Sequence, residues 1–218
     1  MRRNLLIILF FLSTWVPSLQ GQVAYTFGVK GGITLANQGY RITPIDYTLD
    51  TDPVPGPAVS FFLEPFRGAH LSFQLDLSYA CKGSKTTVQG VTVNHLEQDR
   101  ITVIEGEPAL SRFRYLSLSP GARYRLGQGP LVPYVLAGPR LDLLLNYSSD
   151  SDYPLETQRG VVFGISCGAG VEYSLQKTGL FGEFQYHPDL SPVTNEEPLL
   201  IRNRMLSLML GIRWMIPD

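Results

Sequence analysis

The chain has 218 residues, a length that suits one β-barrel domain or at most two small domains. Its 18 Lys and Arg against 19 Asp and Glu leave a formal net charge of −1, so no long-range electrostatic field favours nucleic acid as a partner. Charged residues make up only 17% of the chain. This is below the ~25% that is usual in soluble domains, and it favours a membrane protein.

The N-terminal residues have the layout of a secretory signal peptide. Arg2 and Arg3 precede a mostly apolar run that ends at Pro17, and small and polar residues follow it. The run is too short for a membrane-anchoring helix, which needs ~20 apolar residues. We therefore expect residues 1–21 to be a cleaved signal peptide and residues 22–218 to be the mature domain.

After this run, no uncharged stretch is long enough for a transmembrane helix, so any membrane crossing must be made by strands. Apolar and polar residues alternate in eight segments, as in strands with two different faces. These segments are 25–36, 57–65, 71–82, 112–126, 131–147, 160–175, 180–190 and 204–214. Most have the ~9 to 11 residues with which a tilted strand crosses a bilayer. The expected fold class is all-β, an eight-stranded antiparallel up-and-down transmembrane β-barrel.

The connections between the eight segments alternate in length. The short ones are 66–69, 127–130 and 176–179, and the long ones are 38–56, 83–111, 148–159 and 191–203. Short periplasmic turns and long extracellular loops are typical of outer-membrane barrels. Residues 85–105 of the second long loop alternate by themselves, which indicates that the flanking strands can extend above the membrane as a hairpin.

Residue parity assigns two faces to the expected strands. Leu, Phe, Tyr and other apolar residues fill one parity, which would face lipid, and charged residues occupy the other, which would face the lumen. The ten charges of this expected lumen network are Lys30, Glu64, Asp76, Arg123, Arg125, Arg140, Asp142, Glu172, Glu183 and Arg213. Five basic and five acidic side chains suit a narrow lumen closed by ion pairs, because an unpaired charge at low dielectric is costly.

An eight-stranded lumen is narrow enough to be filled by side chains, so we expect no wide pore. Inward glycines such as Gly28, Gly164, Gly170 and Gly211 are expected to leave room for the long arginine side chains. The same alternation also fits a soluble barrel with its apolar face inside. That lumen, however, could not hold so many Leu, Phe and Tyr side chains.

Four stretches of the chain carry a family resemblance. They are Lys30-Gly31-Gly32, Tyr115-Leu116-Ser117-Leu118-Ser119-Pro120 before Ala122-Arg123-Tyr124, Pro133-Tyr134-Val135-Leu136-Ala137-Gly138-Pro139, and Gly168-Ala169-Gly170-Val171-Glu172. Together they resemble the PorT-like outer-membrane β-barrel proteins of Bacteroidetes, over residues 23–214. The resemblance implies an eight-stranded barrel in the outer membrane and says almost nothing about an activity.

No catalytic, cofactor or metal constellation is evident in the sequence. His70, His95 and His187 lie far apart, without the spacing of a metal site or a catalytic triad, so we expect each to be structural or solvated. Cys81 and Cys167 share the outward parity of strands that are not neighbours, so we expect two free thiols that face lipid. We therefore expect no enzyme, no cofactor and no metal.

Three functional hypotheses remain. The first is an integral outer-membrane protein with a structural, secretion- or assembly-accessory or surface-interaction role. Its expected partners are outer-membrane lipid and, through the long loops, an envelope or secretion-machinery protein, with no nucleic acid. The second is a small channel or solute-binding barrel. The third is an outer-membrane enzyme that acts on lipid or peptide at the loop side, with His187 or His95 beside loop Ser and Asp residues.

Overall fold

A computed structural model describes residues 26–42, 47–94, 100–150, 158–194 and 199–216. The strands are β1 (Thr26–Ile42), β2 (Tyr47–Asp50), β3 (Asp52–Arg67), β4 (Leu71–Asn94), β5 (Arg100–Arg125), β6 (Leu131–Ser149), β7 (Val161–Leu175), β8 (Thr178–Pro188) and β9 (Leu199–Met215). No helix in these ranges is long and apolar enough to span a membrane. The expected signal peptide lies outside the described residues.

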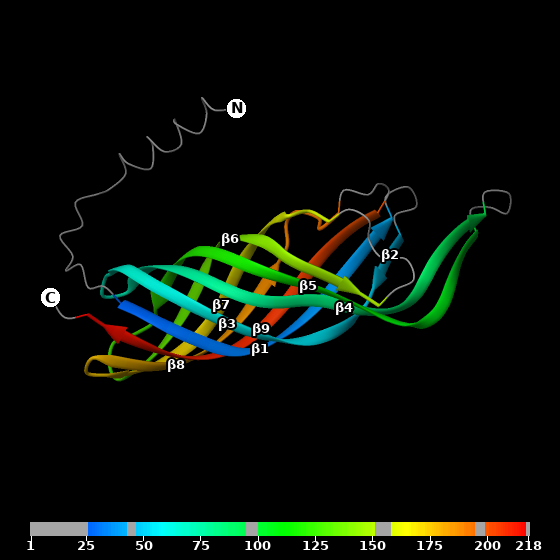
Figure 1. Cartoon of the computed structure of the whole chain (residues 1–218). Coiled ribbons are helices and arrows are strands. Elements are labelled where there is room, and N and C mark those ends of the chain that lie inside the picture. The colour runs from blue at the N-terminus through cyan, green and yellow to red at the C-terminus, as the bar shows by residue number, and fades with distance from the viewer. Residues whose placement is uncertain (1–25, 43–46, 95–99, 151–157, 195–198, 217–218) are drawn as a thin grey trace, which may run out of the picture.

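Eight long strands form a closed ring in chain order (Figure 1). Each pairs with the next in the order β1, β3, β4, β5, β6, β7, β8 and β9, and β9 returns to pair antiparallel with β1 from Thr26↔Met215 to Ile42↔Leu199. The short β2 pairs only with the last residues of β1. The predicted eight-stranded antiparallel up-and-down barrel is confirmed. Closure leaves the ring without an open sheet edge, which is the condition for strands to cross a bilayer.

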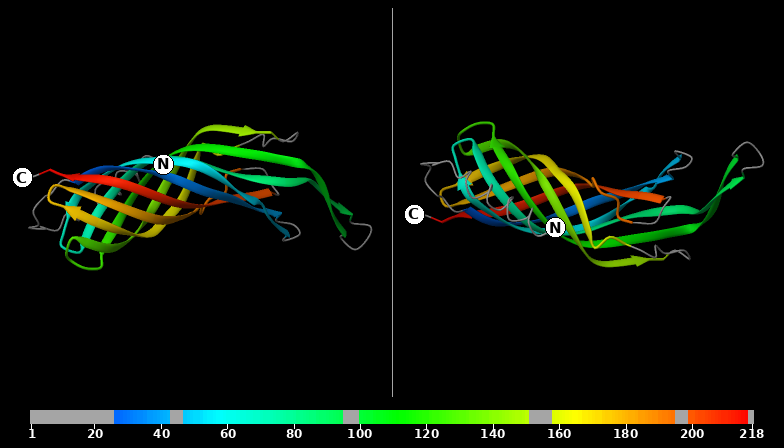
Figure 2. Two further views of the ribbon diagram at one scale, coloured as in Figure 1. Left: turned by 90° about the horizontal axis from the view of Figure 1, so that it is seen from below. Right: turned by 90° about the horizontal axis from the view of Figure 1, so that it is seen from above.

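The β4–β5 hairpin extends beyond the rest of the barrel at the loop end. β4 and β5 pair with each other as far as Asn94↔Arg100, whereas β3 stops pairing with β4 at Lys85 and β6 stops pairing with β5 at Ser111. Both views of Figure 2 show this hairpin continuing beyond the other strands. The hairpin that the alternation of residues 85–105 indicated is therefore present.

The first predicted long loop, 38–56, is largely strand. It contains the end of β1, all of β2 and the start of β3. Pro53 and Pro55 lie in this range, and proline cannot donate a hydrogen bond to a neighbouring strand. In the structure they lie where the pairing of β3 with β4 is irregular, between Pro53 and Ala58, so β4 needs no ladder donor from them.

Side chains alternate between an apolar outer surface and a polar interior. In β4, Leu75 and Leu77 are exposed, while Gln74 and Asp76 between the outward positions are buried. All eight long strands contribute exposed Val, Ile, Leu, Phe or Tyr side chains. A soluble barrel has the opposite arrangement, so this exterior belongs in lipid.

The topology agrees with this surface. The barrel has short turns at one end and longer connections at the other, an apolar outer surface and a polar interior. This combination places the protein in a bacterial outer membrane. We call the two ends of the barrel the turn side and the loop side. The predicted outward parity of the cysteines is also present, and Cys81 on β4 and Cys167 on β7 are both free.

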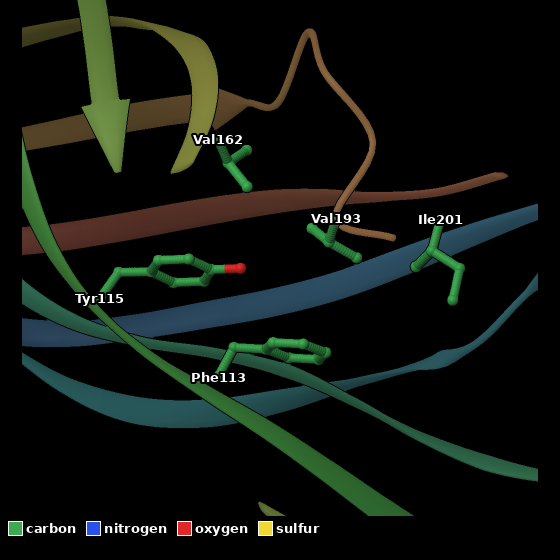
Figure 3. Packing of buried hydrophobic residues seen from close by; sticks show 5 residues of the cluster. All are labelled: Phe113, Tyr115, Val162, Val193 and Ile201. Atoms are coloured by element: carbon green, nitrogen blue, oxygen red, sulfur yellow. The ribbon is translucent and has the colours of Figure 1, made fainter. Parts of the chain in front are cut away.

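An apolar cluster closes the lumen at the loop side (Figure 3). Its buried members are Phe113, Tyr115, Val162, Val193 and Ile201. Val193 belongs to the segment that follows β8, and this segment folds over the mouth. The Val193 amide donates to the Ile201 carbonyl at 2.8 Å, and the Arg159 amide donates to the Val193 carbonyl at 2.8 Å. Figure 3 shows the rings of Phe113 and Tyr115 pointing from β5 toward Val193. The chain itself therefore plugs this end of the barrel.

Candidate functional site

The lumen is where the structure gathers the chemically capable side chains. All ten residues of the expected charge network lie inside the barrel, none more than 8% exposed. Two further charges lie among them, Lys82 at 1% and Asp189 at 5% exposure. Both have the inward parity of the expected segments 71–82 and 180–190, so parity extended to the segment ends would have found them. The twelve charges form three clusters along the barrel axis.

The turn-side cluster consists of Glu64, Arg123, Arg125, Glu172 and Arg213. Arg123 lies between the two carboxylates, with Nη1 at 2.9 Å from Glu64 Oε1 and Nη2 at 2.6 Å from Glu172 Oε2. Arg213 pairs with Glu172 and lies 3.7 Å from Glu64, and Arg125 Nη2 lies 3.3 Å from Glu64 Oε2. Arg67 Nη2 also lies 3.7 Å from Glu172 Oε1, so four guanidinium groups face two carboxylates and the cluster carries excess positive charge.

The central cluster has the opposite imbalance. Lys30 Nζ lies 2.6 Å from Glu183 Oε1 and 2.7 Å from Asp76 Oδ1, so one cation serves two carboxylates. Neutral donors complete the site. Gln74 Nε2 donates to Asp76 at 2.7 Å, and Gln185 Nε2 donates to Glu183 at 2.6 Å.

An aromatic layer connects these two clusters. The Arg123 guanidinium lies over the Tyr134 ring, 3.6 Å from its centroid, and the Tyr134 hydroxyl donates to Glu183 at 2.9 Å. Phe62 and Phe181 pack edge to face in the same layer, with centroids 5.5 Å apart. The cationic turn-side cluster and the anionic central cluster therefore lie on either side of this aromatic layer. The face of the Tyr134 ring attracts the Arg123 guanidinium group through a cation–π interaction.

This layer corrects the expected role of the inward glycines. A Cβ at Gly28, Gly170 or Gly211 would lie within 2.4 Å of the Phe62, Tyr134 or Phe181 ring, respectively. At these three positions the missing side chain makes room for an aromatic ring. Arginine takes such space beside Gly164, where a Cβ would lie 2.5 Å from Arg140 Nη2. Residue parity alone could not separate the two cases, because ring and guanidinium both point inward.

The loop-side cluster consists of Lys82, Arg140, Asp142 and Asp189, and its charges balance. Lys82 Nζ lies 2.5 Å from Asp142 Oδ2 and 2.8 Å from Asp189 Oδ1. Arg140 Nε donates to Asp142 at 3.0 Å, and Arg140 also pairs with Asp189. Asp189 begins the segment that folds over the mouth, so these ion pairs hold the plug against the barrel wall.

A small cavity of about 50 Å³ lies between the central and loop-side clusters, where Lys30, Arg140 and His187 are among its lining residues. A cavity needs ~10 to 15 Å³ to hold one water molecule, so this one is large enough for water. His187 makes hydrogen bonds of 2.9 Å with Ser166 Oγ and 3.0 Å with Ser207 Oγ.

The other histidines do not join this site. His70 lies at a turn, 3.2 Å from the Arg125 carbonyl, and His95 lies outside the described residues. Among the residues that the structure describes, no group of His, Cys, Asp and Glu is arranged to hold a metal ion.

Comparison with known proteins yields structural likenesses only. No protein-family model and no characterised protein sequence matches the chain. Neisserial surface protein A is 17% identical, with 86% of this chain and 96% of that chain covered and a TM-score of 0.47. The N-terminal β-barrel domain of Pseudomonas aeruginosa OprF is 18% identical, with coverages of 89% and 100% and a TM-score of 0.39. The Escherichia coli outer membrane protease OmpT is 7% identical, with coverages of 93% and 100% and a TM-score of 0.47. At these scores no activity, ligand or partner transfers to this chain.

Proposed function

We propose that this protein is a non-enzymatic integral outer-membrane protein that acts through its extracellular loops, in a structural, secretion- or assembly-accessory or surface-interaction role. The observation that carries the proposal is the filled lumen. Its buried charges pair with one another, an aromatic layer crosses it, and the segment after β8 covers its loop-side mouth. Because the interior is occupied by the chain itself, the surface available to a partner lies at the ends of the barrel.

The loop side offers the larger of these surfaces. The β4–β5 hairpin extends past its neighbours, and its pairing continues to Asn94↔Arg100. We propose that an envelope or secretion-machinery protein binds there. The proposal includes export by the signal peptide of residues 1–21 and membership of the PorT-like family of Bacteroidetes, which is supported by the sequence resemblance over residues 23–214.

A hairpin-shortened variant tests this proposal. Residues 88–105 would be replaced by a two-residue turn, which keeps the pairing of β4 with β5 up to Lys85↔Leu110. We expect the variant to fold in the outer membrane and to lose a partner that cross-links to the full-length protein in cells. A variant with a substituted turn-side residue, Lys177→Gln, is the control and should keep the partner. Identical cross-linking by both variants and the full-length protein would contradict a role for the hairpin.

The cavity favours a second candidate, a small channel or solute-binding barrel, because it is a space inside the lumen whose lining includes charged and polar side chains. Charge pairing on both sides of it argues against conduction. Planar-bilayer recordings of purified protein are expected to give no large, stable conductance steps. Such steps would favour the channel. No comparable observation favours an enzyme, since His187 is 8% exposed and engaged by two serines.

A further inference from the structure

The outer face of β9 changes character near the loop side. From Trp214 to Leu206 every outward residue of β9 is apolar. The next two outward residues toward the loop side are Arg204 and Arg202. Both arginines are exposed. On the neighbouring strand β1, Arg41 is exposed on the same outer face, and Gly39, two residues before it, pairs with Arg202.

The same change occurs on β5. Leu118 and Leu116 face outward, and the next two outward residues are Arg114 and Arg112, both exposed. β5 and β9 are four strands apart in the ring of eight, so the two arginine pairs lie on opposite sides of the barrel. None of the four arginines forms an ion pair within the described part of the chain.

Their height matches the far boundary of the membrane. Trp214 lies at the turn side of β9 and Tyr124 at the turn side of β5, where aromatic residues mark the interface. Arg204 is ten residues from Trp214, and Arg114 is ten residues from Tyr124. At ~3.4 Å per residue and a strand tilt of ~40°, ten residues rise about 26 Å, close to the ~25 Å height of an apolar band. Both pairs therefore begin at the level of the outer-leaflet headgroups.

The two ends of the outer surface differ in charge. At the turn side the outward residues Phe27, Tyr124, Tyr173 and Leu180 are aromatic or aliphatic. At the loop side exposed acids such as Asp52 and Glu107 are also present, but they belong to β3 and to the projecting part of β5. The positions directly above the apolar band on β5 and β9 are basic.

We propose that the two arginine pairs, Arg112 with Arg114 and Arg202 with Arg204, bind phosphate groups on lipid headgroups of the outer leaflet. A guanidinium group can donate two parallel hydrogen bonds to one phosphate, and two guanidinium groups at i and i+2 on one face can hold the same headgroup. The partner is the lipid whose chains already contact the apolar band below. This inference rests on the membrane placement of the barrel.

The test is lipid binding to the full mature protein in maltoside micelles, which carry no phosphate. Native mass spectrometry would follow titration with a diphosphorylated glycolipid, lipid A, and with the same glycolipid after removal of its phosphates. We expect binding of the first and much weaker binding of the second. Each arginine near an anionic headgroup contributes about a fivefold change in affinity, so Arg202→Gln with Arg204→Gln should weaken binding at the β9 pair about 25-fold and leave the β5 pair unchanged, whereas all four substitutions together should weaken binding at both pairs.

Two control variants separate the possible causes of a loss in binding. Arg202→Lys with Arg204→Lys keeps the charge but not the paired donors and should give an intermediate loss, whereas Lys177→Gln at the turn side should have less than a twofold effect. Equal binding of the dephosphorylated glycolipid, or full competition by equimolar inorganic phosphate, would overturn the proposal. A sample that is soluble without detergent would instead refute the membrane placement.

Discussion

Lys30 is the position where one substitution should damage the barrel most. It is 4% exposed and is the cation shared by Asp76 and Glu183, at 2.7 and 2.6 Å. Lys30→Met keeps an unbranched side chain of similar length but leaves two buried carboxylates without a cation. Removing one partner from a buried ion pair costs about 3 to 5 kcal/mol, and here both carboxylates are left unpaired. We expect the free energy of unfolding to fall by at least this amount.

Arg125→Met is the matched control because it removes a buried cation from a cluster that has too many. Arg125 lies 3.3 Å from Glu64, which also pairs with Arg123 at 2.9 Å and Arg213 at 3.7 Å. The carboxylate keeps two cations after the change, so the expected loss is only about 1 kcal/mol.

Urea titration of the folded protein in phospholipid vesicles would measure the free energy of unfolding of both variants. The folded fraction at each urea concentration would be read from the different gel migration of the folded and unfolded protein in unboiled samples. Adding Asp76→Asn and Glu183→Gln to Lys30→Met should restore most of the loss, because the triple variant has a neutral central cluster. The charge-imbalance argument is refuted if Lys30→Met unfolds at the same urea concentration as the unsubstituted protein, or if Arg125→Met is equally unstable.

The remaining predictions concern the loop-side cluster, the thiols and export. Arg140→Ala leaves Lys82 alone against two carboxylates and should lower stability by about 3 kcal/mol in the same urea assay; an unchanged midpoint would show that Lys82 suffices. Cys81 and Cys167 should react with a hydrophobic maleimide and resist a polar, impermeant one in intact cells, and a disulfide between them would contradict the strand register. The exported protein should be cleaved near Gly21 and should migrate differently on gels before and after boiling; recovery of uncleaved, detergent-free protein from the periplasm would contradict this.

The sequence by itself determined the barrel and its two faces. Period-two alternation in β4, with Leu75 and Leu77 outward and Gln74 and Asp76 inward, depends only on local backbone geometry, so parity could be read without knowing any neighbour. The alternation of short and long connections also predicted the up-and-down order of the strands. The strand ends were less predictable, since the irregular pairing that accommodates Pro55 is a property of two strands together.

Only the tertiary structure decided which charges meet. Lys30 and Glu183 are 153 residues apart in the chain, and their 2.6 Å contact exists because β1 and β8 are brought near each other by closure through β9. The sequence showed a neutral set of lumen charges, but it could not show that they separate into a cationic turn-side cluster and an anionic central one. That division depends on the stagger of the strands, which sets the height of each side chain along the barrel axis.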